Sequence, residues 1–165
     1  MHNLRHAAVL ASLLSCLTAP AARAAPLDSS LGPLTVTRMA DGLDEPWSLA
    51  FLPGGGFLVT ERAGRLTLFS PDGSTRSDVT GLPAVWEEGQ GGLLDVMVPR
   101  DFTTSRRIWL TYATSKTGET GGTAAGYGQL SADGTTLTDF RAVFTALPTE
   151  GGRHFGARLV EAGAG

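Results

Sequence analysis

The fold of this chain is indicated most clearly by residues 47–73, which read WSLAFLPGGGFLVTERAGRLTLFSPDG. Three short runs, 47–52, 57–61 and 65–69, are mostly apolar or alternate between apolar and polar residues, and glycine-containing turns separate them. Alternation with a period of two is typical of β-strands, and short turns with glycine join antiparallel neighbours. The stretch therefore predicts a three-stranded antiparallel meander.

The same arrangement recurs further along the chain. An apolar run that ends in proline occurs at Pro53 and again at Pro99, which lies 46 positions later (99 − 53). Further strands are expected at residues 34–39, 108–112, 123–130, 137–147 and 156–160, the last of which would open a third unit. A period of about 40–50 residues with four short strands per unit is typical of β-propeller blades. The pattern therefore favours an all-β propeller, and an ordinary β-sandwich is the alternative.

The composition agrees with short strands joined by tight turns. The chain has 165 residues, of which 22 are Gly and 9 are Pro, and these two residue types mark turns. Hydrophobic residues make up 42% of the chain, which provides enough apolar material for a core. The formal net charge is -3 and no basic stripe is present, so a nucleic-acid-binding surface is not expected.

The first residues have the layout of a secretory signal peptide. Arg5 precedes a short apolar run over residues 7–14, and Ala22-Arg23-Ala24 offers small residues where a signal peptide is cleaved. The apolar run is shorter than the about 20 residues that a membrane-spanning helix needs, so no membrane span is expected. We expect a periplasmic or secreted protein. A buried first helix and lipid attachment at Cys16 are the alternatives.

The length of the chain does not match a complete propeller. At the observed period, the residues after the signal peptide supply about three units, whereas propellers typically close their ring with four to eight blades. Unclosed end blades expose strand edges and apolar faces. We therefore expect residues 1–24 to be a signal peptide, 25–33 a linker, and 34–165 the first two to three blades of a propeller truncated at its C-terminus.

Two polar side chains lie immediately before expected inner strands. Gln90 lies in the segment EGQGGLLD (88–95), and His154 lies in the segment GGRHFGARLV (151–160). In a propeller, the loop that enters the innermost strand faces the central channel, where ligands bind. The Gln90 amide can donate and accept hydrogen bonds, and a neutral His154 imidazole can take a proton from a hydroxyl group. A polar turn residue and a structural histidine are the alternative interpretations.

Other common site motifs are missing from the sequence. His154 is the only histidine after residue 24, and no His pair or Cys cluster has the spacing of metal ligands. The sequence also lacks a phosphate-binding Gly-Lys-Ser loop and a Gly-x-Ser-x-Gly elbow. No residue of this chain is therefore assigned as a metal ligand.

Taken in order, several segments resemble the soluble PQQ-dependent aldose sugar (glucose/sorbosone) dehydrogenases. The resemblance is carried by LDEPWSLAFLP (43–53), LVTER (58–62), GRL (64–66), GQGGLLD (89–95) with Asp101 and Phe102, and HFGARLV (154–160). It covers residues 34–165 in the order of the family. The resemblance implies a six-bladed propeller with pyrroloquinoline quinone (PQQ) over the central channel, contact between Gln90 and this cofactor, and His154 as the catalytic base.

The resemblance also implies an activity and a second cofactor. Members of the family oxidise the C1 hydroxyl of aldose sugars to lactones, with hydride passing to PQQ and electrons to an external acceptor. Calcium is implied as well, but its ligands and further Arg and Lys contacts to PQQ correspond to positions beyond Gly165. Arg153 departs from the acidic or amide residue that some members carry there. The chain alone is expected to be inactive, and a non-catalytic ligand- or protein-binding propeller or a lactonase-like hydrolase is the alternative.

Overall fold

The computed structural model describes residues 27–163, so the expected signal peptide, residues 1–24, lies outside the described part. The first elements are β1 (Leu27–Ser29) and β2 (Gly32–Leu34), which form an antiparallel hairpin over most of the stretch expected to be a linker, residues 25–33, and over Leu34. The Ser29 hydroxyl donates to the Gly32 carbonyl oxygen at 2.7 Å and closes the turn. The hairpin belongs to a different compact unit from the residues that follow Thr37. The strand expected over 34–39 is wrong beyond Leu34, because residues 35–39 pair with no strand in the described part.

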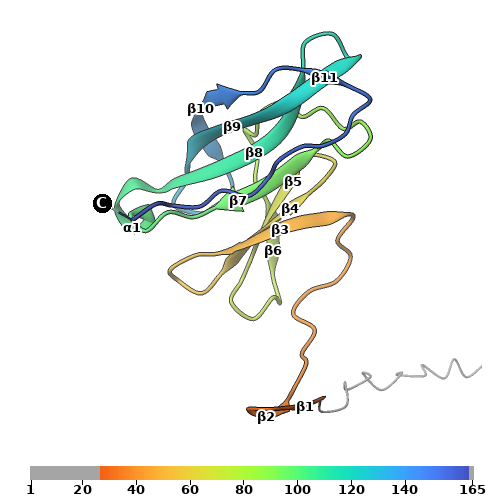
Figure 1. The fold of residues 1–165 in the computed structure, drawn as a ribbon. Helices are drawn as coiled ribbons and strands as arrows, with labels where there is room; N and C mark the ends of the chain where they lie inside the picture. The colour runs from red at the N-terminus through yellow and green to blue at the C-terminus, as the bar shows by residue number, and fades with distance from the viewer. Residues whose placement is uncertain (1–26, 164–165) are drawn as a thin grey trace, which may run out of the picture. The chain divides into compact units, whose positions relative to one another are not determined.

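The first large sheet contains the predicted meander. Its strands are β3 (Pro46–Phe51), β4 (Phe57–Glu61), β5 (Arg65–Phe69) and β6 (Arg76–Asp78), paired antiparallel in the order β3-β4-β5-β6 (Figure 1). The three strands predicted from residues 47–73 are confirmed. Strand β6 was missed because its sequence, Arg-Ser-Asp, is exposed and has no apolar position to reveal it.

A buried carboxylate closes the hairpin between β4 and β5. Glu61 is 2% exposed, and its side chain accepts hydrogen bonds from Arg65 at 2.6 and 2.8 Å and from the backbone N–H of Asp44 at 2.5 Å. Burial by itself raises the pKa of Glu61, but the bonds from Arg65 and Asp44 outweigh burial and hold the pKa below its usual range. Glu61 therefore remains ionised and ties the turn to the segment that precedes β3.

The second large sheet repeats the arrangement with longer strands. It consists of β7 (Leu93–Met97), β8 (Arg107–Ser115), β9 (Thr120–Leu130) and β10 (Leu137–Thr145), with β11 (Thr149–Glu150) paired to the beginning of β9. The one-turn helix α1 (Phe102–Ser105) connects β7 to β8. In the described part of the chain, no helix is long and apolar enough to cross a membrane.

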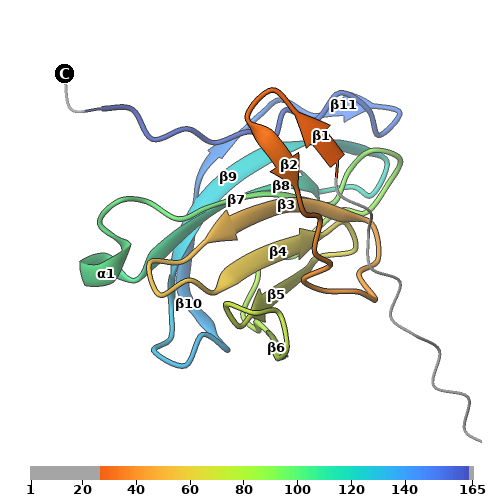
Figure 2. The ribbon, with the colours of Figure 1, turned by 90° about the horizontal axis from the view of Figure 1, so that it is seen from below.

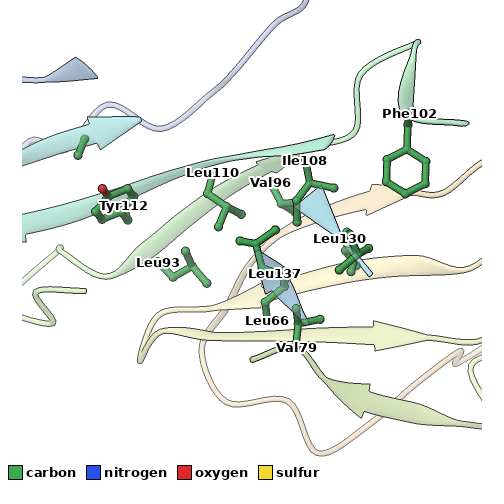
Figure 3. Close-up of a cluster of buried hydrophobic side chains, with 12 residues drawn as sticks. Leu66, Val79, Leu93, Val96, Phe102, Ile108, Leu110, Tyr112, Leu130 and Leu137 are labelled. Atoms are coloured by element: carbon green, nitrogen blue, oxygen red, sulfur yellow. The ribbon is translucent and has the colours of Figure 1, made fainter. Parts of the chain in front are cut away.

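The main core lies between the two sheets. It joins residues of β4 and β5 to residues of β7, β8, β9 and β10, and Leu66, Leu93, Ile108 and Leu110 are completely buried in it (Figure 3). Each sheet is a meander in chain order, and β3, the first strand of one sheet, lies beside β7, the first strand of the next (Figure 2). Successive meanders stacked in this way are the blades of a β-propeller, so the predicted fold class is confirmed for the part of a propeller that the chain contains.

The residues after β11 do not form the inner strand that was expected over 156–160. Residues 151–163, called the C-terminal segment below, follow an extended path alongside β7 but form no strand (Figures 1 and 2). The inner strand predicted over 156–160 is therefore wrong as a hydrogen-bonded strand. A strand requires a neighbour with which to exchange backbone hydrogen bonds, and the described residues supply no second strand of a third unit.

Candidate functional site

The loop before β7 and the C-terminal segment meet through two hydrogen bonds. The backbone N–H of Gln90 donates to the Gly152 carbonyl oxygen at 2.7 Å. The backbone N–H of His154 donates to the side-chain oxygen Oε1 of Gln90 at 2.9 Å. These two bonds, called the clasp below, bring together two residues that are 64 positions apart in the sequence. Both residues that were singled out from the sequence therefore lie at one place.

Glycines allow the two loops of the clasp to approach so closely. Gly89 and Gly152 both have φ of 56°. A Cβ atom on Gly89 would lie 2.5 Å from the Gly152 carbonyl oxygen, and one on Gly152 would lie 2.9 Å from the Glu88 carbonyl oxygen. Ordinary van der Waals contact begins at about 3.4 Å, so a side chain at Gly89 would force the loops apart.

His154 itself has an uncommon backbone conformation. Its φ is 65°, in the left-handed region that non-glycine residues rarely adopt. Such a conformation costs roughly 1–3 kcal/mol and persists only where surrounding contacts hold it, which is common at functional sites. The clasp provides one such contact, because Gln90 Oε1 accepts the backbone N–H of His154.

The polar groups of the clasp are available to a ligand. Gln90 and His154 are both exposed. The bond to His154 uses the Gln90 amide oxygen, and within residues 27–163 neither the Gln90 NH2 group nor the His154 ring is hydrogen bonded. An amide donor and an imidazole on two loops that meet suit a ligand that carries carbonyl or carboxylate oxygens, and PQQ is a ligand of this kind. The chemistry of these two side chains is therefore compatible with such a ligand.

Arg62 attaches the Gln90 loop to the first sheet, a role that the sequence did not reveal. Its Nη2 atom lies 2.7 Å from Glu45 Oε2 and 3.2 Å from Glu87 Oε1, and its carbonyl oxygen accepts the N–H of Leu93 at 3.0 Å. The hydrogen bond with Glu45 raises the pKa of Arg62, and the same bond lowers the pKa of Glu45. The only sequence signal for Arg62 was its place in the LVTER stretch.

An aromatic contact supports the C-terminal segment beside His154. The rings of Trp86 and Phe155 meet edge to face, with centroids 6.1 Å apart. Trp86 packs over Gly121 so closely that a Cβ atom there would lie 2.0 Å from the indole ring. The backbone of Trp86 is bonded to the Ala113 carbonyl oxygen at 2.9 Å, so the contact is anchored to β8.

Side chains that could bind a metal ion do not cluster in the part of the chain that the structure describes. Between residues 27 and 163, no cluster of three or more His, Cys, Asp or Glu side chains could hold a metal ion. Within these residues, the site offers an amide group and an imidazole.

Comparison with known proteins shows that the chain is similar to sugar dehydrogenases. A family model described as Glucose / Sorbosone dehydrogenase matches residues 43–165. The Aldose sugar dehydrogenase YliI of Escherichia coli (strain K12) is 48% identical over 136 residues, which cover 80% of this chain and 36% of that protein. The chain therefore spans about a third of the length of this relative.

Solved structures agree with the fold. The soluble aldose sugar dehydrogenase of Escherichia coli, in its apo-form, is 50% identical with a TM-score of 0.68, and the match covers 74% of this chain and 36% of that one. The PQQ-bound aldose sugar dehydrogenase of Streptomyces coelicolor is 27% identical with a TM-score of 0.63, over 74% of this chain and 36% of that one. With a family model that covers most of its length and relatives of the same class, this chain belongs to the Glucose / Sorbosone dehydrogenase family.

Proposed function

We propose that this chain contributes two blades and part of the active site to an exported PQQ-dependent aldose sugar dehydrogenase. The observation that carries the proposal is the clasp, in which the exposed Gln90 side chain holds the backbone N–H of His154, whose side chain is also exposed, at the junction between the second blade and the C-terminal segment. The family of the chain and the PQQ-bound relative support the choice of cofactor. The substrate class follows from the names of the relatives.

The two residues have separate roles in the proposed reaction. When bound, PQQ supplies the acceptor for the hydride of the sugar C1–H bond. His154 takes the proton of the C1 hydroxyl group at an imidazole nitrogen, and the sugar becomes a lactone. Gln90 donates from its NH2 group to an oxygen of the cofactor while its Oε1 atom holds the backbone of His154. Calcium is proposed as the second cofactor of the whole protein, with an external acceptor receiving the electrons.

The proposal is tested with the whole protein as its gene encodes it. Purified protein is incubated with PQQ and calcium, and oxidation of aldoses is followed by reduction of a dye. We expect sugar oxidation that depends on both additions. If no oxidation is observed with any aldose, the enzyme assignment is wrong, and assays for sugar binding and lactone hydrolysis then separate the binding propeller from the hydrolase.

Replacement of Gln90 is expected to separate cofactor binding from positioning of His154. In Gln90→Glu, a carboxylate oxygen can still accept the His154 N–H but the NH2 donor is lost, whereas Gln90→Ala loses both. A hydrogen bond contributes roughly 1 kcal/mol, or about fivefold, so both variants should bind PQQ at least about fivefold more weakly. Only Gln90→Ala should also lower kcat at saturating PQQ. Titration with PQQ and steady-state kinetics measure the two effects, and equal kcat values for both variants would contradict the double role.

We also propose that the protein is exported and that residues 1–24 are removed. Arg5, the apolar run that follows it and the small residues at 22–24 support this assignment. Intact-mass measurement of the protein from periplasm or medium should show an N-terminus at or near Ala25. Exported material that retains Met1 would contradict cleavage, and a lipid-modified N-terminus at Cys16 would show a lipoprotein instead.

A further inference from the structure

A buried carboxylate connects the first sheet to the C-terminal segment. Asp95 lies on β7 and is 1% exposed. Its Oδ1 atom accepts the hydroxyl of Ser48 on β3 at 2.5 Å, and its Oδ2 atom accepts the backbone N–H of Leu159 at 2.7 Å. The Arg158 Nη1 atom lies 3.3 Å from Oδ1. One side chain on the second blade therefore contacts both the first blade and the C-terminal segment.

The contacts around Asp95 repeat from blade to blade. In the first blade, the N–H of Ser48 donates to Thr60 Oγ1 at 3.0 Å, and the Thr60 hydroxyl donates to the Leu94 carbonyl oxygen at 2.6 Å. A threonine on the second strand of the blade thus reaches the first strand of the next blade. Asp95 is the residue that directly follows Leu94 in the sequence.

The second blade uses the same pattern toward the C-terminal segment. The N–H of Asp95 donates to Thr111 Oγ1 at 2.9 Å, and the Thr111 hydroxyl donates to the Ala157 carbonyl oxygen at 2.8 Å. In this pattern, Asp95 in the second blade corresponds to Ser48 in the first blade, and Ala157 corresponds to Leu94. Arg158 follows Ala157 just as Asp95 follows Leu94, so Arg158 takes the equivalent position in the C-terminal segment. The C-terminal segment occupies the same place beside β7 that β7 occupies beside β3.

Burial makes these contacts necessary. A carboxyl group that is buried without partners is strongly destabilising, and Asp95 is satisfied by one hydroxyl, one backbone N–H and one guanidinium. The Leu159 N–H in turn has Asp95 as its acceptor. An apolar residue at this position would leave that N–H without its bond and remove one of the contacts that hold the C-terminal segment to the blade.

We infer that Asp95 is a positioning residue for His154, an inference that rests on the proposed function. The C-terminal segment is held by the clasp at Gly152 and His154 and by Thr111 and Asp95 at Ala157 and Leu159. Because His154 has a left-handed backbone, it keeps its place only while both ends of this stretch are held. Loss of the Asp95 bond lets the stretch relax and displaces the imidazole.

The test is Asp95→Asn in the whole protein. Asparagine has the same shape, but its NH2 group cannot accept a hydrogen bond, so the Leu159 N–H or the Ser48 hydroxyl loses its acceptor. A displacement of about 1 Å can reduce turnover about 100-fold, so we expect kcat to fall 10- to 100-fold while the KM for sugar and the affinity for PQQ change less than about threefold. In the protein without PQQ, deuterium uptake of peptides covering residues 152–163 should rise.

Two further variants keep the result interpretable. Thr111→Val removes the bond to Ala157 and should lower kcat and raise deuterium uptake in the same peptides, even if Asp95→Asn fails to fold. Glu61→Gln is the matched control, because it changes a buried carboxylate that does not contact the C-terminal segment. It should lower the melting temperature but leave kcat and uptake over 152–163 at wild-type values.

The outcomes separate this inference from the proposed function. Wild-type kcat in folded Asp95→Asn and Thr111→Val, or a loss of kcat without greater uptake over 152–163, would overturn the positioning role. A wild-type protein that is inactive with PQQ and calcium would overturn the proposed function and, with it, any catalytic consequence of Asp95. The deuterium uptake measurement would still decide whether Asp95 holds the segment.

Discussion

Replacement of His154 with alanine is expected to lower kcat for sugar oxidation by about 100- to 10,000-fold, the range that a positioned general base contributes. The variant keeps its backbone N–H, so the bond to Gln90 Oε1 remains possible and PQQ binding should stay close to that of the wild type. The measurement is dye-linked sugar oxidation by the whole protein after reconstitution with PQQ and calcium, together with a PQQ titration.

Arg153→Ala provides the neighbouring control for His154→Ala. Arg153 is exposed, lies next to His154 and has no role in the clasp, so its loss should change kcat less than about threefold. Added imidazole should partly restore activity to His154→Ala, because a free base can enter the space that the side chain leaves. Wild-type kcat in His154→Ala would show that another group accepts the proton.

The second large effect is expected at Gly89. In Gly89→Ala, the new Cβ atom would lie 2.5 Å from the Gly152 carbonyl oxygen, so the two loops must separate by about 1 Å to reach ordinary contact. This movement stretches the Gln90–Gly152 bond and displaces His154, and a misplacement of this size can reduce turnover about 100-fold. We therefore expect kcat to fall about 100-fold, measured at saturating PQQ and sugar.

Gly118→Ala separates the close contact at Gly89 from backbone strain. Gly118 also has a positive φ, 82°, but a Cβ atom there would meet nothing within 4 Å. Both substitutions place alanine in a left-handed conformation, yet only Gly89→Ala forces the loops of the clasp apart. Gly118→Ala should keep wild-type kcat. If the two variants have the same kcat, the distance between the loops does not control activity.

The strands that could be predicted are those that a short stretch of sequence reveals by its pattern of apolar residues and turns. Strands β3, β4 and β5 follow from apolar or alternating side chains and short glycine turns within residues 47–69, and β4, whose five residues are all buried, packs into the core. Strand β6 has no apolar residue, and its pairing with β5 depends on where the chain turns after Asp72 and Gly73. The C-terminal segment has the apolar pattern of a strand but no strand partner among the described residues.

The sequence by itself determined the all-β class and the repeat, and it singled out Gln90 and His154 from their places before expected inner strands, with their roles implied by family resemblance. These results depend on residue type and spacing, which are read directly along the chain. Only the tertiary structure decided that the Gln90 side chain holds the backbone of His154 and that buried Asp95 joins Ser48 to Leu159. These contacts connect residues 47 to 64 positions apart, and they form only because the packed sheets bring β3, β7 and the C-terminal segment side by side.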